Sequence, residues 1–191
     1  MQQRKLAIYI GLLIAAALLI AVTTKFYEPK VLSDNAKTYV LEDLRAKNPN
    51  ADIIDIISWE SKTNAEGGEY YQIKASATEG MSTPCPKRVH YEYFYPEQNF
   101  IPKPPEHVVV GCRACEGPGC VIAFPEEAII ASHTNTGSSA IKGYLEQYPD
   151  SRAGVKREGD GWKVSWRSAS APYGYDVHIE NNGDIRRISR A

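Results

Sequence analysis

The sequence lacks the short motifs that identify most hydrolases, nucleotide-binding proteins and metalloproteases. It has no G-x-S-x-G, no Walker-type phosphate loop, no G-x-G-x-x-G and no H-E-x-x-H. The four histidines are scattered, and none stands at metal-binding spacing from another: His90, His107, His133 and His178. We therefore expect no enzymatic activity and no bound cofactor.

The sequence also lacks an excess of either charge. It has 22 Lys and Arg against 23 Asp and Glu, a net charge of −1. Without Arg4 and Lys5 at the N-terminus, 20 basic residues remain against 23 acidic ones, a net charge of −3. This balance is too weak to indicate nucleic acid or an anionic surface as a partner.

Residues 6–24 contain no charged side chain and consist mostly of Leu, Ile, Ala and Val. As a helix they would span about 28 Å, close to the hydrocarbon thickness of a bilayer. A cleaved signal peptide is the alternative, but its apolar region is usually only about 7–15 residues long. The only plausible cleavage signature, Ala21-Val22-Thr23, ends in threonine. We therefore predict an uncleaved transmembrane helix, with membrane lipid as its first partner.

The basic residues that flank this segment are nearly balanced, with Arg4 and Lys5 before it and Lys25 and Lys30 after it. The very short N-terminal tail favours an N-terminus inside the cell. We predict a cytoplasmic tail at 1–5, the helix at 6–24, a linker at 25–32, and a body outside the cytoplasm at the cell membrane.

Only four cysteines are present, clustered within the body: Cys85, Cys112, Cys115 and Cys120. An even, clustered set is typical of disulfides in an oxidising compartment. A four-cysteine zinc or iron site and a redox-active C-x-x-C are alternatives. A hairpin of strands at 88–95 and 107–111 would bring Cys85 beside Cys112 and leave Cys115 to pair with Cys120. Three pairings remain open.

The body contains two segments with the same order of elements. In 138–191, four apolar side chains at helical spacing follow a Ser-Ser cap: Ile141, Tyr144, Leu145 and Tyr148. Strands are expected near 153–157, 162–167, 175–179 and 185–188, with turns at 159–161 and 181–184. Strict alternation predicts that Trp162 and Trp166 face the core while Lys163 and Arg167 are exposed.

The segment 33–111 repeats this order. A helix is expected from Ser33 or Asp34 to Asn48, then strands near 52–59, 71–75, 89–95 and 107–110. The row Tyr91, Tyr93 and Tyr95 is interpreted as sheet core rather than a ligand platform. His90 and His178 are expected at exposed positions of their strands. Residues 112–137 form a cysteine-containing connector with a short helix opened by Phe124-Pro125-Glu126-Glu127 and ended by His133.

A helix followed by a four-stranded antiparallel meander, twice over, is an α+β pattern. The second segment resembles a PepSY-type repeat, which has a cystatin-like layout. The resemblance rests on the helix that ends near Pro149, the strand Trp162-Lys163-Val164, and the strand 175–179 that runs into a turn at Gly183. It extends to the first segment by topology. It implies two small modules behind a membrane anchor, as in extracytoplasmic membrane proteins of bacteria and archaea.

The function expected from these features is binding or regulation, through contact with another envelope protein, a protease or a membrane complex. A proline-rich excursion offers candidate contact residues: Phe100, Pro102, Pro104 and Pro105. Two alternatives stay open. One is a metal- or redox-active cysteine protein, with zinc or iron on the four cysteines. The other is an accessory subunit whose helix docks inside a larger membrane assembly.

Overall fold

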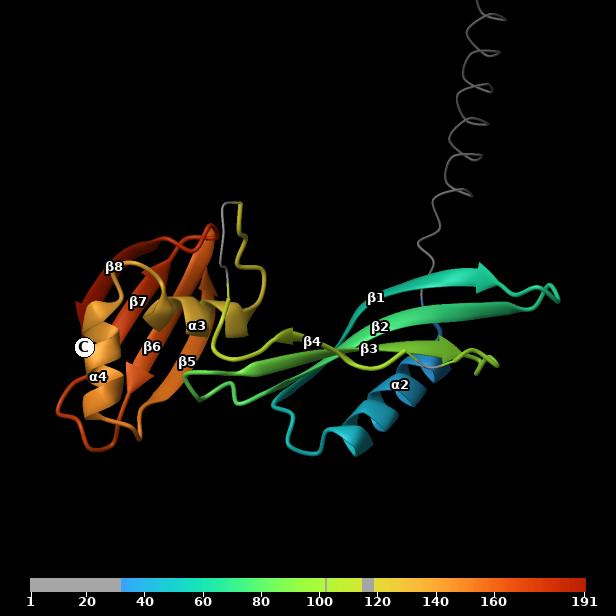
Figure 1. Cartoon of the computed structure of the whole chain (residues 1–191), viewed down its shortest axis with the longest axis horizontal. Coiled ribbons are helices and arrows are strands. Elements are labelled where there is room, and N and C mark those ends of the chain that lie inside the picture. The colour runs from blue at the N-terminus through green and yellow to red at the C-terminus, as the bar shows by residue number, and fades with distance from the viewer. Residues whose placement is uncertain (1–31, 102, 115–118) are drawn as a thin grey trace, which may run out of the picture. The chain divides into compact units, whose positions relative to one another are not determined.

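The structure is a computed structural model that describes residues 32–101, 103–114 and 119–191 (Figure 1). Within these residues, Asp34–Ala191 form one compact unit. No helix of the described residues is both long and apolar enough to cross a membrane. The predicted membrane helix at 6–24 lies outside the described residues. The α+β class, with two four-stranded antiparallel sheets, is confirmed.

The first sheet follows helix α2 (Asp34–Lys47) and has the order β1-β2-β3-β4. Its strands are β1 (Ile53–Thr63), β2 (Glu69–Glu79), β3 (Lys87–Tyr95) and β4 (Glu106–Val109). The predicted turn joins β1 to β2, with Gly67 at φ 84° and the Asn64 side chain accepting hydrogen bonds from the N–H groups of Glu66 and Gly68. Both flanking strands run up to this turn, so β1 continues beyond the predicted end at Trp59.

The core of this half lies between α2 and the sheet. Helix α2 buries Ala36, Val40 and Leu44, and Ile73 is fully buried on β2. Tyr93 is buried too, and its hydroxyl donates to the carboxylate of Asp43 at 2.8 Å. Tyr91 and Tyr95 are half-buried beside it. Tyr93 is therefore a core residue, as predicted, whereas Tyr91 and Tyr95 are only partly covered.

The second sheet has the order β5-β6-β7-β8 and follows two helices, α3 (Pro125–Thr134) and α4 (Ser139–Gln147). Its strands are β5 (Arg152–Glu158), β6 (Gly161–Arg167), β7 (Tyr175–Ile179) and β8 (Ile185–Arg190). Trp166 and Val164 are fully buried and Trp162 is 9% exposed, so the predicted inward face of β6 is confirmed.

Helix α3, which the sequence suggested was part of a connector, packs on β5, β6 and β7, and α4 packs against α3. The prediction that only the helix after Ser138 packs with this sheet was therefore incomplete. The four consecutive residues Ala128, Ile129, Ile130 and Ala131 of α3 are fully buried. A helix buried on all sides shows no polar face, so its sequence carries no 3.6-residue periodicity.

The outer face of the second sheet carries ion pairs. Asp176 on β7 lies 2.6 Å from Lys163 and 2.7 Å from Arg167. The side chain of Lys163 is only 23% exposed, so the prediction that it is exposed was wrong, whereas Arg167, at 49%, is exposed as predicted. Burial acts to raise the pKa of Asp176, but hydrogen bonds from Lys163, Arg167 and Ser165 outweigh it and hold the pKa well below its usual value.

Replacing Trp166 with alanine should lower the free energy of unfolding by about 3–5 kcal/mol, because the indole is fully buried and leaves a cavity. Equilibrium urea unfolding of the full chain measures this. Trp59→Ala is the matched control, because Trp59 is only half-buried and should cost less. A loss below about 1 kcal/mol for Trp166→Ala would show that the face of β6 is misassigned.

Asp176→Asn should remove an acid-dependent part of the stability. A carboxyl whose folded pKa is depressed stabilises the fold above the unfolded value, about 3.9, and loses this contribution as the pH falls toward the folded pKa. Melting temperatures of the two proteins should therefore differ most above pH ~4 and converge below it. Asp160→Asn, at an exposed turn position, is the control. A difference independent of pH would contradict the ion-pair account.

Candidate functional site: the disulfide and the histidine of helix α3

Cys85 and Cys112 form a disulfide across 27 positions of sequence. Cys85 precedes β3, and Cys112 follows β4. These strands pair antiparallel, with Arg88 opposite Val109, so the start of one strand meets the end of the other. This is the pair that the predicted hairpin favours. Cys120 is also disulfide-bonded, whereas Cys115 lies outside the described residues.

Two tight turns bring the cysteines together. Before Cys85, Gly80 adopts φ 75°, and its carbonyl accepts hydrogen bonds from the N–H and the hydroxyl of Thr83. After β4, Gly111 and Cys112 adopt φ 67° and 60°. A left-handed conformation is uncommon for cysteine. It turns the chain sharply at the end of β4, so Cys112 points back toward the loop that carries Cys85.

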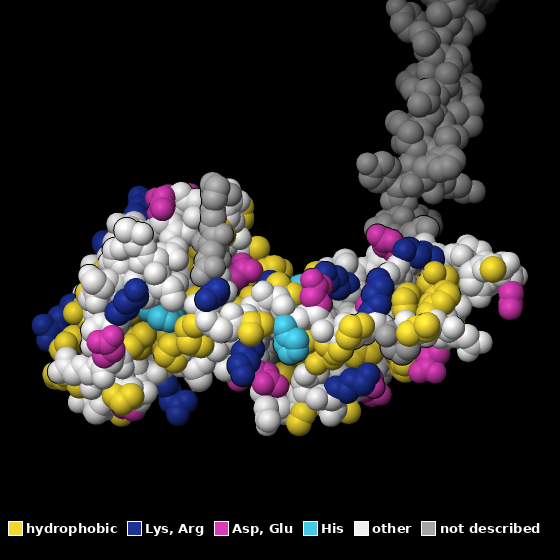
Figure 2. All heavy atoms as spheres, viewed as in Figure 1, with side chains coloured by type: hydrophobic (Ala, Val, Ile, Leu, Met, Phe, Trp, Pro, Cys, Tyr) yellow, Lys and Arg dark blue, Asp and Glu magenta, His cyan; other side chains and the backbone are white. Residues whose placement is uncertain are grey.

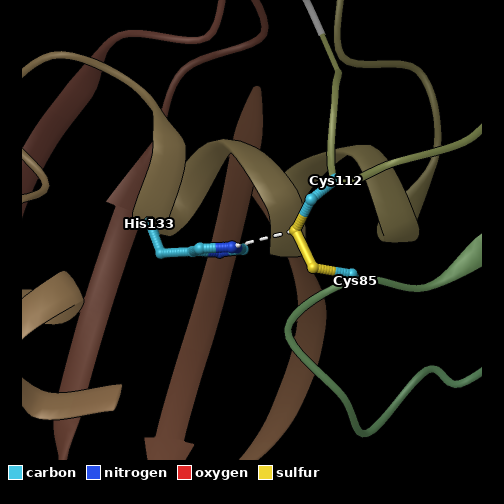
Figure 3. Close-up of side chains that lie close together, drawn as sticks. All are labelled: Cys85, Cys112 and His133. Carbon is cyan, nitrogen blue, oxygen red and sulfur yellow. Dashed lines mark hydrogen bonds between the residues drawn. A yellow bond between two sulfur atoms is a disulfide. The ribbon is translucent and has the colours of Figure 1, made fainter. Parts of the chain in front are cut away.

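The ring of His133, at the end of α3, points at this disulfide (Figure 3). Its Nε2 lies 3.4 Å from the Sγ atom of Cys112, and its Nδ1 lies 3.0 Å from the carbonyl oxygen of Ile129. Because a carbonyl oxygen only accepts, Nδ1 carries the proton. In the neutral ring, the lone pair of Nε2 therefore faces the sulfur.

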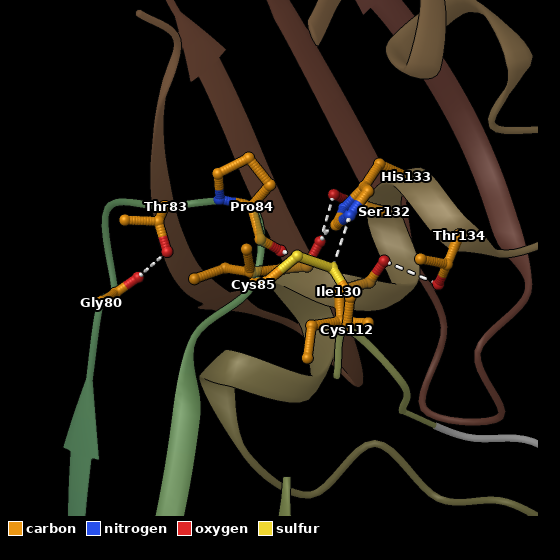
Figure 4. Close-up of a disulfide and its surroundings, with 10 residues drawn as sticks. Gly80, Thr83, Pro84, Cys85, Cys112, Ile130, Ser132, His133 and Thr134 are labelled. Carbon is orange, nitrogen blue, oxygen red and sulfur yellow. Dashed lines mark hydrogen bonds between the residues drawn. A yellow bond between two sulfur atoms is a disulfide. The ribbon is translucent and has the colours of Figure 1, made fainter. Parts of the chain in front are cut away.

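Several hydrogen bonds fix the end of α3 around this histidine (Figure 4). The hydroxyl of Ser132 donates to the carbonyl of Ile129 at 2.6 Å and accepts from the indole N–H of Trp166 at 3.0 Å. The Trp166 ring also packs edge-on against His133. His133 is 8% exposed, and burial lowers its pKa, although the hydrogen bond to Ile129 opposes this shift. Burial therefore favours the neutral form of the imidazole, and the hydrogen bond to Ile129 orients its ring.

The other end of α3 is attached to β3 by a buried ion pair. The Arg88 guanidinium contacts the carboxylates of Glu126 and Glu127, and it stacks on the Phe124 ring at 3.7 Å. The side chains of Arg88 and Glu126 are 4% and 2% exposed. Burial raises the pKa of Glu126 despite the adjacent arginine. The second carboxylate oxygen of Glu127 accepts from the N–H groups of Ala123 and Phe124, which satisfies N–H groups at the start of the helix.

The predicted contact loop lies between β3 and β4. Phe100 is 44% exposed and packs edge-on against Tyr70 and Phe94. Pro104 and Pro105 are exposed, and Pro102 lies outside the described residues. Sequence reasoning missed Ile101, which is 92% exposed. A hydrophobic residue next to a proline carries no local signal that separates a core position from a surface position.

A groove of about 550 Å³ runs beside this loop, and Phe100 and Pro105 line it together with α2 and β3. Its charged lining residues are Lys47, Glu92, Glu97 and Lys103. Figure 2 shows hydrophobic side chains interspersed with charged ones over the face that it presents. The loop and its groove thus combine an apolar tip with charges of both signs.

Two predicted surface histidines differ in their surroundings. His178 is partly buried, and its Nδ1 lies 3.2 Å from a carboxylate oxygen of Glu158. His90 is half-buried, and both ring nitrogens are buried without a hydrogen-bond partner. The prediction that His90 is exposed was therefore wrong. Because β4 pairs with β3, His90 stands opposite Glu106 within the sheet rather than at its edge. Burial and the neighbouring Lys74 and Arg88 lower its pKa.

Removing one partner of the buried pair at the start of α3 should destabilise the protein strongly. Arg88→Met should lower the free energy of unfolding by about 3–5 kcal/mol, because it leaves the buried Glu126 without its cation. The matched control is Lys156→Met, which breaks the exposed pair of Lys156 with Glu158 and should cost under about 1 kcal/mol. Chemical denaturation measures both. Equal effects would show that Arg88 is not desolvated in solution.

No protein-family model matches this chain, and neither the curated proteins nor the solved structures compared with it include a significant match. Similarity therefore assigns no family to the chain, and the arrangement of its own side chains is what points to a function.

Proposed function

We propose that this protein is a membrane-anchored extracytoplasmic binding protein without catalytic activity, whose two α+β halves are cystatin- or PepSY-like modules. Its partner is another envelope protein, such as a protease or a subunit of a membrane complex. The charge-free segment 6–24 supports the anchor. The oxidised Cys85 and Cys112 support a location outside the cytoplasm, since disulfides are rare in reducing compartments.

The observation that carries the binding role is the exposed apolar tip of the loop between β3 and β4. Ile101 is 92% exposed, and its neighbour Phe100 is 44% exposed. Single exposed hydrophobic residues are normal. Here, however, the apolar tip adjoins a cluster of aromatic rings, because Phe100 packs on Tyr70 and Phe94. A partner that covers Ile101 would bury a side chain that the free protein leaves in water.

Polar contacts attach three residues of the loop to the neighbouring elements. Gln98 accepts a hydrogen bond from Asn64 at 3.1 Å, and Glu97 accepts one from the hydroxyl of Tyr39 at 2.7 Å. Lys103 lies 2.8 Å from a carboxylate oxygen of Glu92. Contacts of this kind reduce the conformational entropy that these side chains lose on binding, and this favours affinity.

The chemistry of the groove favours a protein partner. Aromatic walls from Tyr91 and Phe94 lie beside both cations and carboxylates. Mixed charge of this kind gives little attraction to nucleic acid or to an anionic bilayer, whereas it complements a protein surface with an apolar anchor and a polar rim.

A photo-crosslinking amino acid placed at Ile101 in the full-length chain should capture a defined protein in intact cells. The control carries the same amino acid at Glu146, an exposed residue of α4, and should not capture that protein. Mass spectrometry identifies the crosslinked protein. Ile101→Asp should then reduce its copurification at least tenfold, whereas Val121→Asp, also at an exposed hydrophobic position, should not.

Orientation is tested in spheroplasts prepared from cells that contain the full-length chain. Protease added from outside should digest the body and leave a membrane-bound N-terminal stub. A protected full-length chain would place the body in the cytoplasm and contradict the proposed location.

In the crosslinking experiment, equal capture of the partner from positions 101 and 146 would contradict the assignment of the loop as the contact surface.

A further inference from the structure

We propose that reduction of the Cys85–Cys112 disulfide converts these two cysteines, together with His133, into a binding site for one thiophilic metal ion such as Zn²⁺. This inference is independent of the proposed binding function. It uses His133, which lies 21 positions beyond Cys112 and which no sequence pattern groups with the cysteines. The cysteines Cys115 and Cys120 are not part of the proposed site.

The ligand atoms already lie close together. The two sulfurs and a ring nitrogen of His133 are all within 4.8 Å of one another. In a tetrahedral zinc site with bonds of about 2.3 Å to sulfur and about 2.0 Å to nitrogen, a ligand nitrogen and a ligand sulfur lie about 3.5 Å apart. The distance from His133 Nε2 to Cys112 Sγ is 3.4 Å. This edge of the coordination polyhedron therefore exists before any metal binds.

Only the sulfur of Cys85 has to move. After reduction the two sulfurs must separate to about 3.8 Å, the sulfur–sulfur distance of the same tetrahedron. Cys85 is exposed and stands in the loop between β2 and β3. Rotation of its side chain therefore provides the movement while Cys112 and His133 stay in place.

His133 is prepared as a ligand. Metal-binding histidines almost always donate their second ring N–H to a carbonyl or carboxylate, which fixes the tautomer and the ring orientation. The hydrogen bond from Nδ1 to the carbonyl of Ile129 has this form. Ser132 and Trp166 hold the same turn of α3. The Nε2 lone pair faces the Sγ of Cys112, and the Sγ of Cys85 lies within 4.8 Å, as a Cys₂His site requires.

The charges also balance. Two thiolates neutralise one divalent cation, and the imidazole binds as the neutral ring. His133 closes the site on its buried side, and Cys85 leaves it open to solvent on the other. The fourth coordination position is therefore accessible to water or a small ligand.

The redox step needs a dithiol reductant. One of its thiolates attacks the Sγ of Cys85, an exposed residue, which breaks the disulfide and releases Cys112 as a thiolate. The second thiol of the reductant then displaces Cys85, so the reductant leaves as a disulfide and the protein holds two reduced sulfurs. Metal binding afterwards displaces the remaining thiol protons.

The test uses the full-length chain in detergent, reduced with a phosphine and freed of reductant without oxygen. Co²⁺ serves as the probe because thiolate ligands give it intense charge-transfer absorption and tetrahedral d–d bands. We expect these bands only after reduction, saturating at one Co²⁺ per chain and disappearing when Zn²⁺ is added. No signal in the reduced chain would overturn the proposal.

Variants assign the ligands. The double variant C115S/C120S should keep the signal, and C85S/C112S should lose it. His133→Asn should weaken the affinity more than tenfold, whereas His107→Asn, at an exposed position of β4, should leave it unchanged. An affinity that is indifferent to His133, or a signal that follows Cys115 and Cys120, would overturn the proposal.

Near-UV circular dichroism shows whether the reduced chain stays folded. If reduction alone loosens the fold, Zn²⁺ should restore the near-UV spectrum of the C115S/C120S variant but not that of its His133→Asn derivative. A reduced chain that unfolds and that Zn²⁺ does not restore would also overturn the proposal.

Discussion

The two ends of helix α3 set the geometry on which the rest of this structure depends. At its start, Glu126 and Glu127 hold the buried guanidinium of Arg88, which belongs to β3. At its end, His133 lies against the disulfide that ties the loop before β3 to the end of β4. Between these ends, the helix is buried on the second sheet. One ten-residue helix therefore belongs to the core of one sheet and is attached to the other.

The attachment of α3 at both ends explains why a charged pair is tolerated where both side chains are almost fully shielded from solvent. Arg88 and Glu126 are almost fully buried, and desolvation of two charges is offset only when their geometry and hydrogen bonds are good. Here the guanidinium meets two carboxylates and stacks on the Phe124 ring. An apolar contact of the same size could pack in several ways. The fork of the arginine specifies one orientation of α3 and hence the position of His133 near the disulfide.

The sequence predicted helices and strands well where one face of each is buried and the other is exposed to solvent. Alternation along β6 identified Trp162 and Trp166 as core residues, and the spacing of Val40 and Leu44 identified α2. Periodicity failed for α3, because its middle is buried all round. It also misplaced His90, because Lys103 and Pro104 of the following loop lie near it, and alternation along one strand does not reveal such a contact.

The candidate site shows a different limit of prediction from sequence. The hairpin of β3 and β4 made the pairing of Cys85 with Cys112 a favoured outcome, because both cysteines flank paired strands. The position of His133 could not be inferred in this way. It depends on how α3 lies on the second sheet and on the buried arginine at its other end, and neither contact leaves a local pattern. The two glutamates after Pro125 indicate that a helix starts there. They do not indicate which strand carries the arginine that they bind.

The disulfide and the exposed loop belong to one covalent unit. The segment closed by Cys85 and Cys112 contains β3, the loop with Ile101, and β4. Closing a loop of this length removes about 3–4 kcal/mol of chain entropy from the unfolded state. Strand β4 has only four residues, and the covalent link adds to the strand pairing that holds its end near β3. The same bond that faces His133 therefore also closes the hairpin that presents Ile101.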